Sequence, residues 1–261
     1  MQNERSLTII TVVKNDVESI EKTLLSVLSQ SLQNIEYIVI DGASTDGTYE
    51  LIKKYENRIS ILKSSEDKNL YDAINKGIEL AGGDYIGLLH SGDTYVNQYT
   101  LEEIFKAVHN SSPEIIYSDL VLVSSKTKRI HRYYSGRIFK PYLLRTGYMP
   151  PHPTLLINRE VIQNVGLYRI DISIAADFEY IMRIFSKKNV AYMYYNKVTI
   201  RMSNMGLSNR SYKSKILIYK QIGHILREYN LINLQYLRYF IRIGEYLYPI
   251  LSRLFRSQNP F

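Results

Sequence analysis

The sequence predicts an α/β protein in which helices flank a central, mostly parallel sheet. Two observations carry this prediction. Short apolar segments alternate with amphipathic ones over residues 1–100, and small polar clusters follow the ends of the apolar segments. Such alternation is typical of right-handed βαβ units. Ligands of open α/β sheets bind just outside the carboxyl ends of the strands, so the polar clusters predict one binding site.

The elements follow in order along the chain. Strands are expected at Leu7–Val13, Ile35–Ile40, Ser60–Lys63 and Tyr85–His90, and helices near Val17–Gln30, Thr48–Tyr55 and Leu70–Ala81. From about Glu114 the pattern changes, and Glu114–Val123 with Arg129–Tyr134 predicts an antiparallel hairpin. A further helix is expected at Asp177–Ser186. We divide the chain into a catalytic domain, residues 1–209, and a helical tail, residues 210–261.

Composition narrows the classes of protein. The 261 residues suit one large α/β domain with a short appendage, and the lack of cysteine excludes disulfides and thiolate metal sites. The first residues lack the pattern of a signal peptide, and no uncharged apolar stretch reaches the roughly 18 residues of a spanning helix. These features predict a cytoplasmic protein.

The positive charge belongs to the tail. Residues 210–261 hold nine Lys or Arg against two Glu, which is most of the net charge of +8. Over Asn233–Gln258 a narrow basic stripe runs along an otherwise apolar segment, as in helices that lie in a membrane interface. We expect the tail to bind an anionic membrane surface; the alternative is packing on the catalytic domain or on a second subunit. Nucleic acid is not expected, because the basic residues are interleaved with apolar ones.

Three carboxylate positions could carry chemistry, and each has a purely structural alternative. Asp41 ends an apolar segment and opens a loop of small residues, where it could accept a hydrogen bond from a base or where its neighbours could cap a helix. Asp93, in a Gly-containing turn, could ligate Mg²⁺ or Mn²⁺ or be a turn residue. Asp177 opens a helix, where it could be a catalytic base or a favourable charge at the helix start.

Taken together, these segments resemble family 2 glycosyltransferases of the GT-A fold, in the bacterial polysaccharide-assembly branch. The resemblance covers about residues 5–209. It rests on the segments TVVKND, VIDGASTDGT, EDKNLYDAINKGIELAGGDYIGLLHSGD, PHPTLLINREV and AADFEYIMRI.

The resemblance implies a role for each matching residue. The residues on the donor side would be Thr11, Asn15, Asp41, Asp72, Ser91 and Arg201. Asp41 would read the uracil of a UDP-sugar, Asp93 would ligate a divalent cation, Mn²⁺ or Mg²⁺, and Asp177 would be the general base. His152 would lie on the acceptor side, and the Gly206–Ser208 stretch would close over the diphosphate. Ser91 departs from the DxD-type motif, which puts the affinity and identity of the metal in doubt.

The implied activity is inverting transfer of a sugar to an acceptor hydroxyl of a saccharide or a lipid-linked oligosaccharide. Such an enzyme would work at the inner face of the bacterial cell membrane. One alternative is a sugar nucleotidyltransferase, although the segment Lys14–Val17 lacks the glycine-rich loop of that class. Another is a catalytically degenerate module that binds nucleotide-sugars without turnover.

Overall fold

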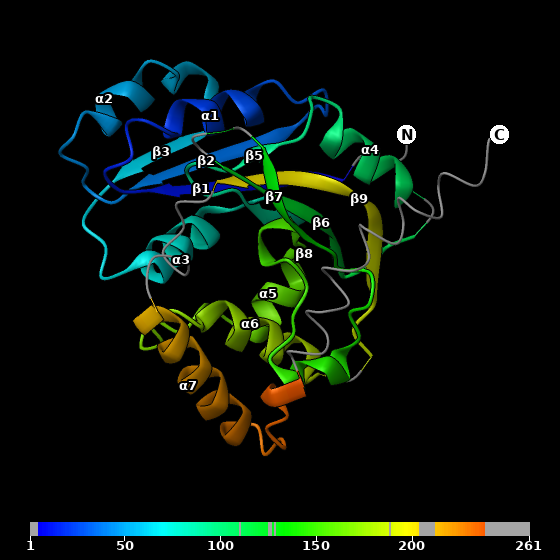
Figure 1. Ribbon diagram of the computed structural model, residues 1–261. Coiled ribbons are helices and arrows are strands. Elements are labelled where there is room, and N and C mark those ends of the chain that lie inside the picture. The colour runs from blue at the N-terminus through cyan, green and yellow to red at the C-terminus, as the bar shows by residue number, and fades with distance from the viewer. Residues whose placement is uncertain are drawn as a thin grey trace.

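Helices cover both faces of one central sheet in the computed structural model (Figure 1). The structure describes residues 5–109, 111–124, 127, 129–187, 189–203 and 212–237. The predicted fold class is confirmed. The Gly206–Ser208 stretch and residues 238–261 of the tail lie outside the described residues.

The first half of the chain consists of the predicted βαβ units. Its elements are β1 (Leu7–Val13), α1 (Ile20–Leu28), β2 (Ile35–Asp41), α2 (Thr48–Lys53), β3 (Ile61–Ser64), α3 (Leu70–Leu80) and β4 (Tyr85–Leu88). Every strand and helix predicted here is confirmed within a few residues. Helix α3 begins at Leu70 because the Asn69 side chain accepts hydrogen bonds from the free N–H groups of Tyr71 and Asp72, at 3.0 and 3.1 Å.

The second half is less regular. Its elements are β5 (Thr94–Tyr95), α4 (Thr100–Ala107), β6 (Ile115–Val123), β7 (Ile130–Tyr134), β8 (Leu156–Asn158), α5 (Arg159–Val165), α6 (Ala176–Phe185), β9 (Tyr192–Ser203) and α7 (Tyr212–Glu228). Strands β6 and β7 form the predicted antiparallel hairpin. The long strand β9 was not predicted.

Within the described residues the strands form one nine-stranded sheet. Its order is β3-β2-β1-β4-β8-β6-β9-β5, with β7 paired to β6. The pairings make β1, β2, β3, β4, β6 and β9 run in one direction and β5, β7 and β8 in the other. The carboxyl ends of the six parallel strands therefore lie at one edge of the sheet, where the polar clusters of the sequence come together.

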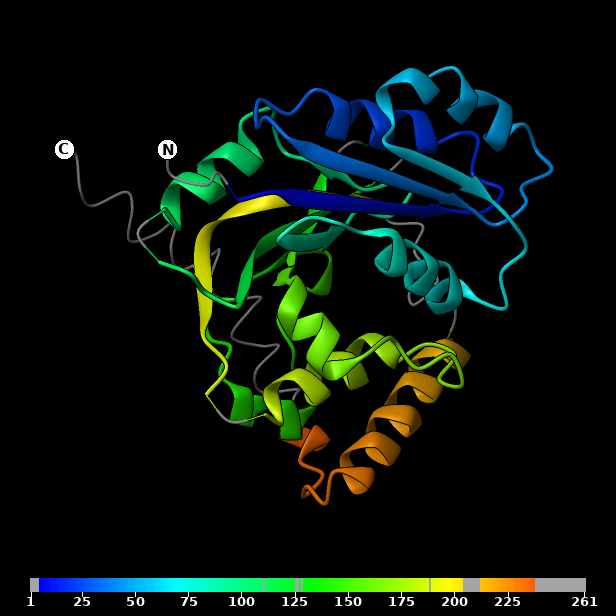
Figure 2. The same cartoon turned by 180° about the vertical axis from the view of Figure 1, so that it is seen from behind.

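Each face of the sheet has its own core. Helices lie over both faces in the front and rear views (Figures 1 and 2). Alternate residues of β1 divide between them: Ile9 faces the core under α1, α2 and α4, whereas Ile10 faces the core under α3, α5, α6 and α7. Contact on the second face is close, because a Cβ at Gly77 of α3 would lie 2.5 Å from Ile10 Cγ2. Helix α3 is thereby held against β1.

The first part of the predicted tail packs on the catalytic domain. Ile222, Ile225 and Leu226 of α7 are buried in the core under α6. Beyond α7 the backbone N–H of Leu234 donates to the carbonyl of Arg145 at 2.9 Å, and Gln235 is buried. The helix predicted over Asn233–Gln258 starts instead with a 3₁₀ turn at Gln235–Leu237, and its remainder lies outside the described residues. No helix in the described part of the chain has the length and hydrophobicity to cross a bilayer.

Candidate active site

The loops that follow β1, β2 and β4 are joined by hydrogen bonds at the carboxyl edge of the sheet. We call residues 14–17, 42–47 and 90–93 the strand-end loops. The backbone N–H of Asn15 donates to Ser44 Oγ at 2.9 Å, and Asn15 Oδ1 accepts from the N–H of Thr45 at 2.8 Å. The third loop is attached through Ser91, whose hydroxyl donates to Asp16 Oδ2 at 2.7 Å. Three segments far apart in sequence thus form one polar surface.

Asp41 is fully buried at the end of β2, yet only one of its carboxylate oxygens has partners among the described residues. Oδ2 accepts from the Ser44 N–H at 3.1 Å and from the Ser64 hydroxyl at 2.6 Å. Oδ1 is buried without a partner. A buried acceptor of this kind is costly unless something donates to it, so Oδ1 is suited to an N–H group of a ligand.

The capping alternative applies to a different residue of the same loop. Asp46 Oδ1 accepts from the backbone N–H of Thr48 at 3.0 Å, and its Oδ2 accepts from the N–H of Val17 at 3.2 Å. Asp46 therefore satisfies free N–H groups near the starts of α1 and α2. Asp41 Oδ2 accepts from the Ser44 N–H within the loop, but Asp41 Oδ1 has no such local contact.

Asp93 lies in a tight turn after β4 and is also buried. Gly92 has a φ of 90°, which a residue with a side chain rarely adopts, and its N–H donates to Thr23 Oγ1 at 3.0 Å. Asp93 Oδ1 accepts from the Ser203 N–H at 3.2 Å. Burial, only partly offset by this hydrogen bond, raises the pKa of Asp93 to about 7. This carboxylate is suited to a nearby positive charge.

Strand β9 brings a distant part of the chain to the same turn. Thr94 of β5 pairs with Arg201 of β9, which places Ser203 against Asp93. Arg201 is exposed at this edge. The structure therefore brings the predicted residues Asn15, Asp41, Ser91, Asp93 and Arg201 to one edge of the sheet.

Asp72 belongs to a charged group at the start of α3. Its Oδ2 accepts from the Lys68 N–H at 3.0 Å and lies 3.7 Å from Lys76 Nζ. Lys76 contacts Asp67 more closely, at 2.5 Å, and this carboxylate raises the pKa of Lys76. Asp67 Oδ2 would lie only 2.9 Å from a Cβ at Gly42, so the group adjoins the loop that begins after Asp41.

Thr11 is a further residue predicted on the donor side. It is fully buried in β1, and its hydroxyl is hydrogen-bonded to Tyr37 Oη at 2.9 Å and to the Leu89 carbonyl at 2.8 Å. The side chain is therefore not positioned to contact a nucleotide. A threonine near a strand end can point either way, and the packing of β2 and β4 decides here. That Thr11 lines the donor site stays a prediction, which its backbone atoms could fulfil.

Asp177 lies in the first turn of α6 and is partly buried, with 18% of its side chain exposed. Its Oδ1 accepts from the Phe178 N–H at 2.7 Å, and its Oδ2 lies 3.3 Å from His152 Nδ1. The predicted acceptor-side residue and the predicted base are therefore direct neighbours. Burial, with a further contribution from the negative charge of Asp177, raises the pKa of Tyr71. Burial also raises the pKa of Tyr168, to which Asp177 contributes less.

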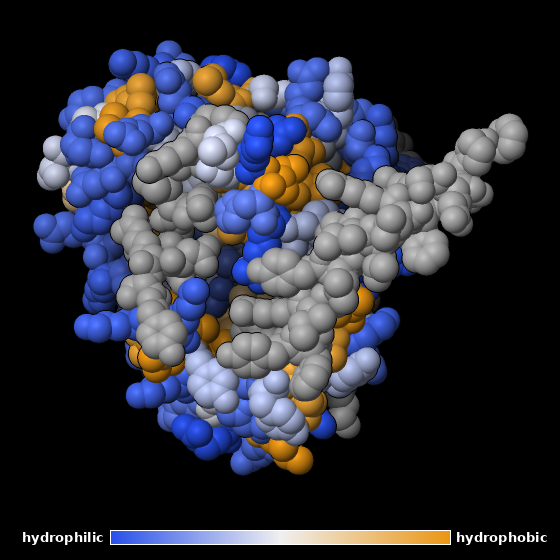
Figure 3. Space-filling view, in the orientation of Figure 1, coloured by the Kyte–Doolittle hydropathy of each residue, from blue (hydrophilic) through white to orange (hydrophobic). Residues whose placement is uncertain are grey.

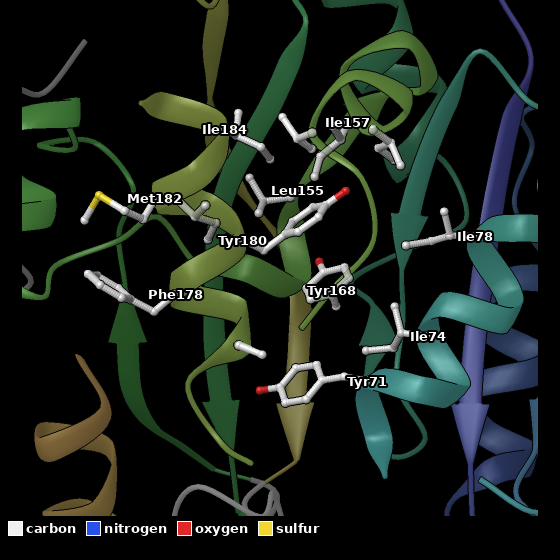
Figure 4. Packing of buried hydrophobic residues seen from close by; sticks show 14 of the residues in the cluster. Tyr71, Ile74, Ile78, Leu155, Ile157, Tyr168, Phe178, Tyr180, Met182 and Ile184 are labelled. Carbon is white, nitrogen blue, oxygen red and sulfur yellow. The ribbon is translucent and has the colours of Figure 1, made fainter. Parts of the chain in front are cut away.

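Three tyrosines, Tyr71, Tyr168 and Tyr180, lie in a row between α3 and α6 (Figure 4). The ring centroids of Tyr71 and Tyr168 are 5.8 Å apart, and those of Tyr168 and Tyr180 are 3.9 Å apart. The Tyr71 hydroxyl donates to the Ile174 carbonyl at 2.6 Å, which attaches α3 to the segment before α6. The position of Asp177 thus depends on contacts between α3 and the loop that leads into α6.

His152 also has a second histidine nearby. Burial, with a further contribution from His152, lowers the pKa of His90 to about 4, so His90 is neutral at pH 7. His152 borders an apolar cavity of about 10 Å³ shared with Leu155 and Tyr180, which is close to the size of one water molecule. One side of the His152 ring therefore faces hydrophobic surroundings.

The residues present fit a nucleotide-bound divalent cation better than a metal site made by protein alone. The described residues contain no group of three or more His, Asp or Glu side chains that could hold a metal. A nucleotide-bound cation needs only one or two protein carboxylates, since phosphates and water supply the other ligands. Asp93 meets this requirement, and a cation would stabilise the ionised form that burial disfavours.

Sequence reasoning missed several residues of the site. Asp16 and Asp67 stand inside the recognised segments TVVKND and EDKNLYD, so their position was visible but their contacts were not. Tyr71 and Tyr168 gave no signal, because buried aromatic residues are ordinary in a core.

The fold and the site define a class of protein with the GT-A fold, in which a nucleotide-sugar site lies at the carboxyl edge of the sheet. The family model described as Glycosyl transferase family 2 matches residues 8–166. The chain belongs to this family. Among curated proteins it is 30% identical over 190 residues to an uncharacterized glycosyltransferase of Mycobacterium tuberculosis, covering 70% of each chain. It is 29% identical over 176 residues to the Escherichia coli UDP-Glc:alpha-D-GlcNAc-diphosphoundecaprenol beta-1,3-glucosyltransferase WfaP, covering 63% of this chain and 65% of that one.

Solved structures confirm the fold. Staphylococcus aureus TarS in complex with UDP-GlcNAc superposes with a TM-score of 0.64 at 15% identity, covering 85% of this chain and 66% of the TarS chain. The mannosyltransferase PcManGT from Pyrobaculum calidifontis, in complex with GDP-Man and Mn²⁺, superposes with a TM-score of 0.63 at 16% identity, covering 87% of this chain and 64% of that one. The chain thus spans about two thirds of these structural neighbours.

Proposed function

We propose that this protein transfers a sugar from a UDP-sugar to an acceptor hydroxyl, with inversion at the anomeric carbon. The observation that carries the proposal is a pair of buried carboxylates at one edge of the sheet that are incompletely satisfied. Asp41 has an unpartnered oxygen, and Asp93 has a pKa of about 7. A nucleotide with a divalent cation would supply both missing partners.

The choice of UDP rests on Asp41 and on the relatives. Asp41 Oδ1 is a hydrogen-bond acceptor, and the N3–H of uracil is a donor. WfaP is named for UDP-Glc, and TarS is known in complex with UDP and UDP-GlcNAc. Guanine also carries an N–H donor on its pairing edge, and PcManGT is known in complex with GDP-Man. GDP is therefore the nucleotide against which UDP must be tested.

The mechanism follows from where charge develops. Departure of the diphosphate leaves negative charge, which a divalent cation at Asp93 would stabilise as a Lewis acid. Positive charge grows on the sugar, as in glycoside hydrolysis. Asp177 removes the proton of the acceptor hydroxyl as the oxygen attacks the anomeric carbon opposite the leaving group. One base and one displacement give inversion.

The acceptor is proposed to be a lipid-linked saccharide. WfaP is named for a diphosphoundecaprenol acceptor, and the basic tail of this chain suits an anionic membrane surface at the inner face of the bacterial cell membrane. On α7 the apolar residues Ile216, Leu217 and Tyr219 are exposed beside Lys215 and Lys220. Figure 3 shows the described hydrophobic residues of this face in several separate groups, one of them at the lower end, where residues 229–237 lie in Figure 1. Exposed apolar residues beside lysines suit a membrane interface.

Thermal shift measurements test the donor site. The melting temperature is measured with UDP, GDP, CDP and dTDP, each with and without Mn²⁺, for the wild type and for Asp93→Asn. We expect UDP with Mn²⁺ to raise the wild-type value most, because a ligand of the folded state stabilises it. The gain due to Mn²⁺ should disappear in Asp93→Asn. A larger shift with GDP would contradict the choice of UDP, and no shift with any nucleotide would contradict the proposed donor site.

Transfer measurements separate an enzyme from a degenerate binding module. Radiolabelled UDP-glucose, UDP-galactose, UDP-GlcNAc and UDP-GalNAc are each incubated with sugar-diphospholipid acceptors in vesicles that contain anionic lipid. Transfer with any pair supports the proposal, whereas UDP binding without transfer favours the degenerate module. Deletion of residues 238–261, which spares the packed residues up to Leu237, should reduce binding to the vesicles; unchanged binding would contradict the membrane role of the tail.

A further inference from the structure

One oxygen of the Asp177 carboxylate accepts a hydrogen bond, and the other lies close to His152. Oδ1 accepts from the Phe178 N–H at 2.7 Å, and Oδ2 lies 3.3 Å from Nδ1 of His152. A carboxylate has about four lone-pair sites, so two contacts leave room for an acceptor hydroxyl. A base that is fixed in one orientation avoids losing rotamer freedom when the substrate arrives.

We propose that His152 is a positioning residue for Asp177, donating the hydrogen of Nδ1 to Oδ2 so that the carboxylate faces the acceptor hydroxyl. The inference rests on the proposed function, which makes Asp177 the general base. His152 transfers no proton in this role. It acts only through the orientation of the carboxylate, as hydrogen-bonded supporting residues do in other active sites.

The backbone at His152 is well defined by its neighbours. The residue lies between Pro151 and Pro153 and begins a short 3₁₀ helix, His152–Thr154, in which the Leu155 N–H donates to the His152 carbonyl at 3.1 Å. The ring borders the small apolar cavity beside Leu155 and Tyr180. Pro153 restricts the backbone of His152, and 30% of the His152 side chain is exposed.

Among the described residues, three titratable groups near the pair are uncharged at pH 7. His90 faces His152 and is neutral, since its pKa is lowered to about 4. Tyr71 and Tyr168, which sense the charge of Asp177, have raised pKa values and stay protonated. With neutral surroundings, the contact between Nδ1 and Oδ2 is the main direct interaction of the Asp177 side chain with another ionisable group among the described residues.

Nitrogen NMR tests the contact without any substrate. The chain has five histidines, so ¹⁵N-histidine labelling gives few signals, and His152 is assigned by its loss in His152→Asn. We expect His152 to carry a hydrogen on Nδ1 in the wild type and to lose that preference in Asp177→Ala. A neutral ring with its hydrogen on Nε2 in the wild type would overturn the proposal, because Nδ1 could not then donate.

Two amide substitutions separate positioning from simple packing. The side-chain nitrogen of Asn can take the place of Nδ1, whereas that of Gln can take the place of Nε2. We therefore expect His152→Asn to keep kcat within about threefold of the wild type, and His152→Gln and His152→Ala to lower it roughly tenfold to a hundredfold. The KM for the sugar nucleotide should stay within about twofold in all three. Equal loss in His152→Asn and His152→Ala, or a raised donor KM in place of a lowered kcat, would overturn the proposal.

The chain offers a matched control. His224 Nε2 lies 3.1 Å from Glu228 Oε1 on the exposed side of α7, so His224→Ala removes a similar pair outside the site. It should leave kcat unchanged. If the wild type transfers no sugar from any donor tested, the proposed function fails while the NMR result still decides the contact. If the wild type is active and His152→Ala retains full kcat, only the positioning role fails.

Discussion

The carboxylates at the strand ends and the carboxylate of Asp177 differ in the partners that the chain gives them. In the loops, Asp41 keeps a buried oxygen without a partner and burial raises the pKa of Asp93 to about 7. At the start of α6, Oδ1 of Asp177 accepts a hydrogen bond from the chain and Oδ2 lies 3.3 Å from His152 Nδ1. The loops are thus arranged for a ligand that brings donors and positive charge, whereas Asp177 is oriented before any ligand binds.

The largest expected effect concerns Asp177. Asp177→Asn should lower kcat by roughly 10²- to 10⁴-fold, because an amide cannot remove the acceptor proton. UDP binding should change little, since Asn keeps the size and shape of the side chain. The measurement is turnover at saturating donor, with Asp171→Asn, an exposed carboxylate in the loop before α6, as control. A rate close to the wild type would remove Asp177 from the role of base.

The second effect concerns Asp93, whose ionised form is disfavoured by burial. The pKa of Asp93 is raised from 3.8 to about 7 in the folded chain. At pH values between these two, the folded state keeps a proton on Asp93 that the unfolded state has lost. The free energy of unfolding of the metal-free protein therefore falls as pH rises through this window. Above it the penalty is about 4 kcal/mol.

Asp93→Asn should remove much of that penalty. In the presence of a chelator, its melting temperature should exceed the wild-type value by about 5–10 °C at pH 8 and by little at pH 4. Calorimetry of both proteins at the two pH values checks this. A difference that does not grow with pH would show that Asp93 is satisfied within the protein, and the contrast with Asp177 would be lost.

The third prediction concerns the unpartnered oxygen of Asp41. In Asp41→Asn the amide oxygen can keep the contacts with Ser44 and Ser64, which places the NH₂ group where Oδ1 lies. An acceptor thus becomes a donor. UDP should bind roughly tenfold to a hundredfold more weakly. The affinity for CDP, whose N3 is an acceptor, should rise relative to that for UDP.

Calorimetric titration of both nucleotides with Mn²⁺ measures this change. Asp84→Asn is the control, because Asp84 bonds to Ser6 at the opposite edge of the sheet. Equal weakening of UDP and CDP would mean that Asp41 supports the loop without reading the base.

The smallest effect concerns the contact between α3 and the loop before α6. Tyr71→Phe removes the hydroxyl that donates to the Ile174 carbonyl but leaves the ring stacked on Tyr168. We expect a loss of about 1 kcal/mol in the free energy of unfolding, with a several-fold lower kcat. Urea unfolding and turnover are compared with Tyr55→Phe, whose exposed hydroxyl bonds only to Glu21. Unchanged kcat would show that Asp177 is oriented without this contact.

The two regions also differed in how far the sequence predicted them. The strand-end loops were located correctly, because apolar strands and the polar residues that follow them are local patterns, and parallel strands bring their ends together. Burial of the Thr11 side chain was not visible in the sequence, since it depends on Tyr37 of β2 and on Leu89 just after β4. The contacts of Asp16 and Asp67 were likewise not visible in the local pattern.

The surroundings of Asp177 depended much more on tertiary structure. Asp177 and His152 were both selected, but as residues with separate roles, 25 positions apart. Helical periodicity predicts which residues share a face of a helix. It does not predict which other part of the chain packs against that face. Strand β9, which brings Ser203 to Asp93, crosses the sheet between β6 and β5, a placement that no local pattern specifies.

The sequence by itself determined the fold class, the family and the edge of the sheet at which the site lies, because these follow from alternating hydrophobicity and from motifs of fixed spacing. Only the tertiary structure decided which carboxylates lack partners and which are held. Burial and hydrogen bonding of a side chain depend on segments that packing brings together, and those properties set its charge and orientation. Asp41, Asp93 and Asp177 are the same type of residue, and they differ in what surrounds them.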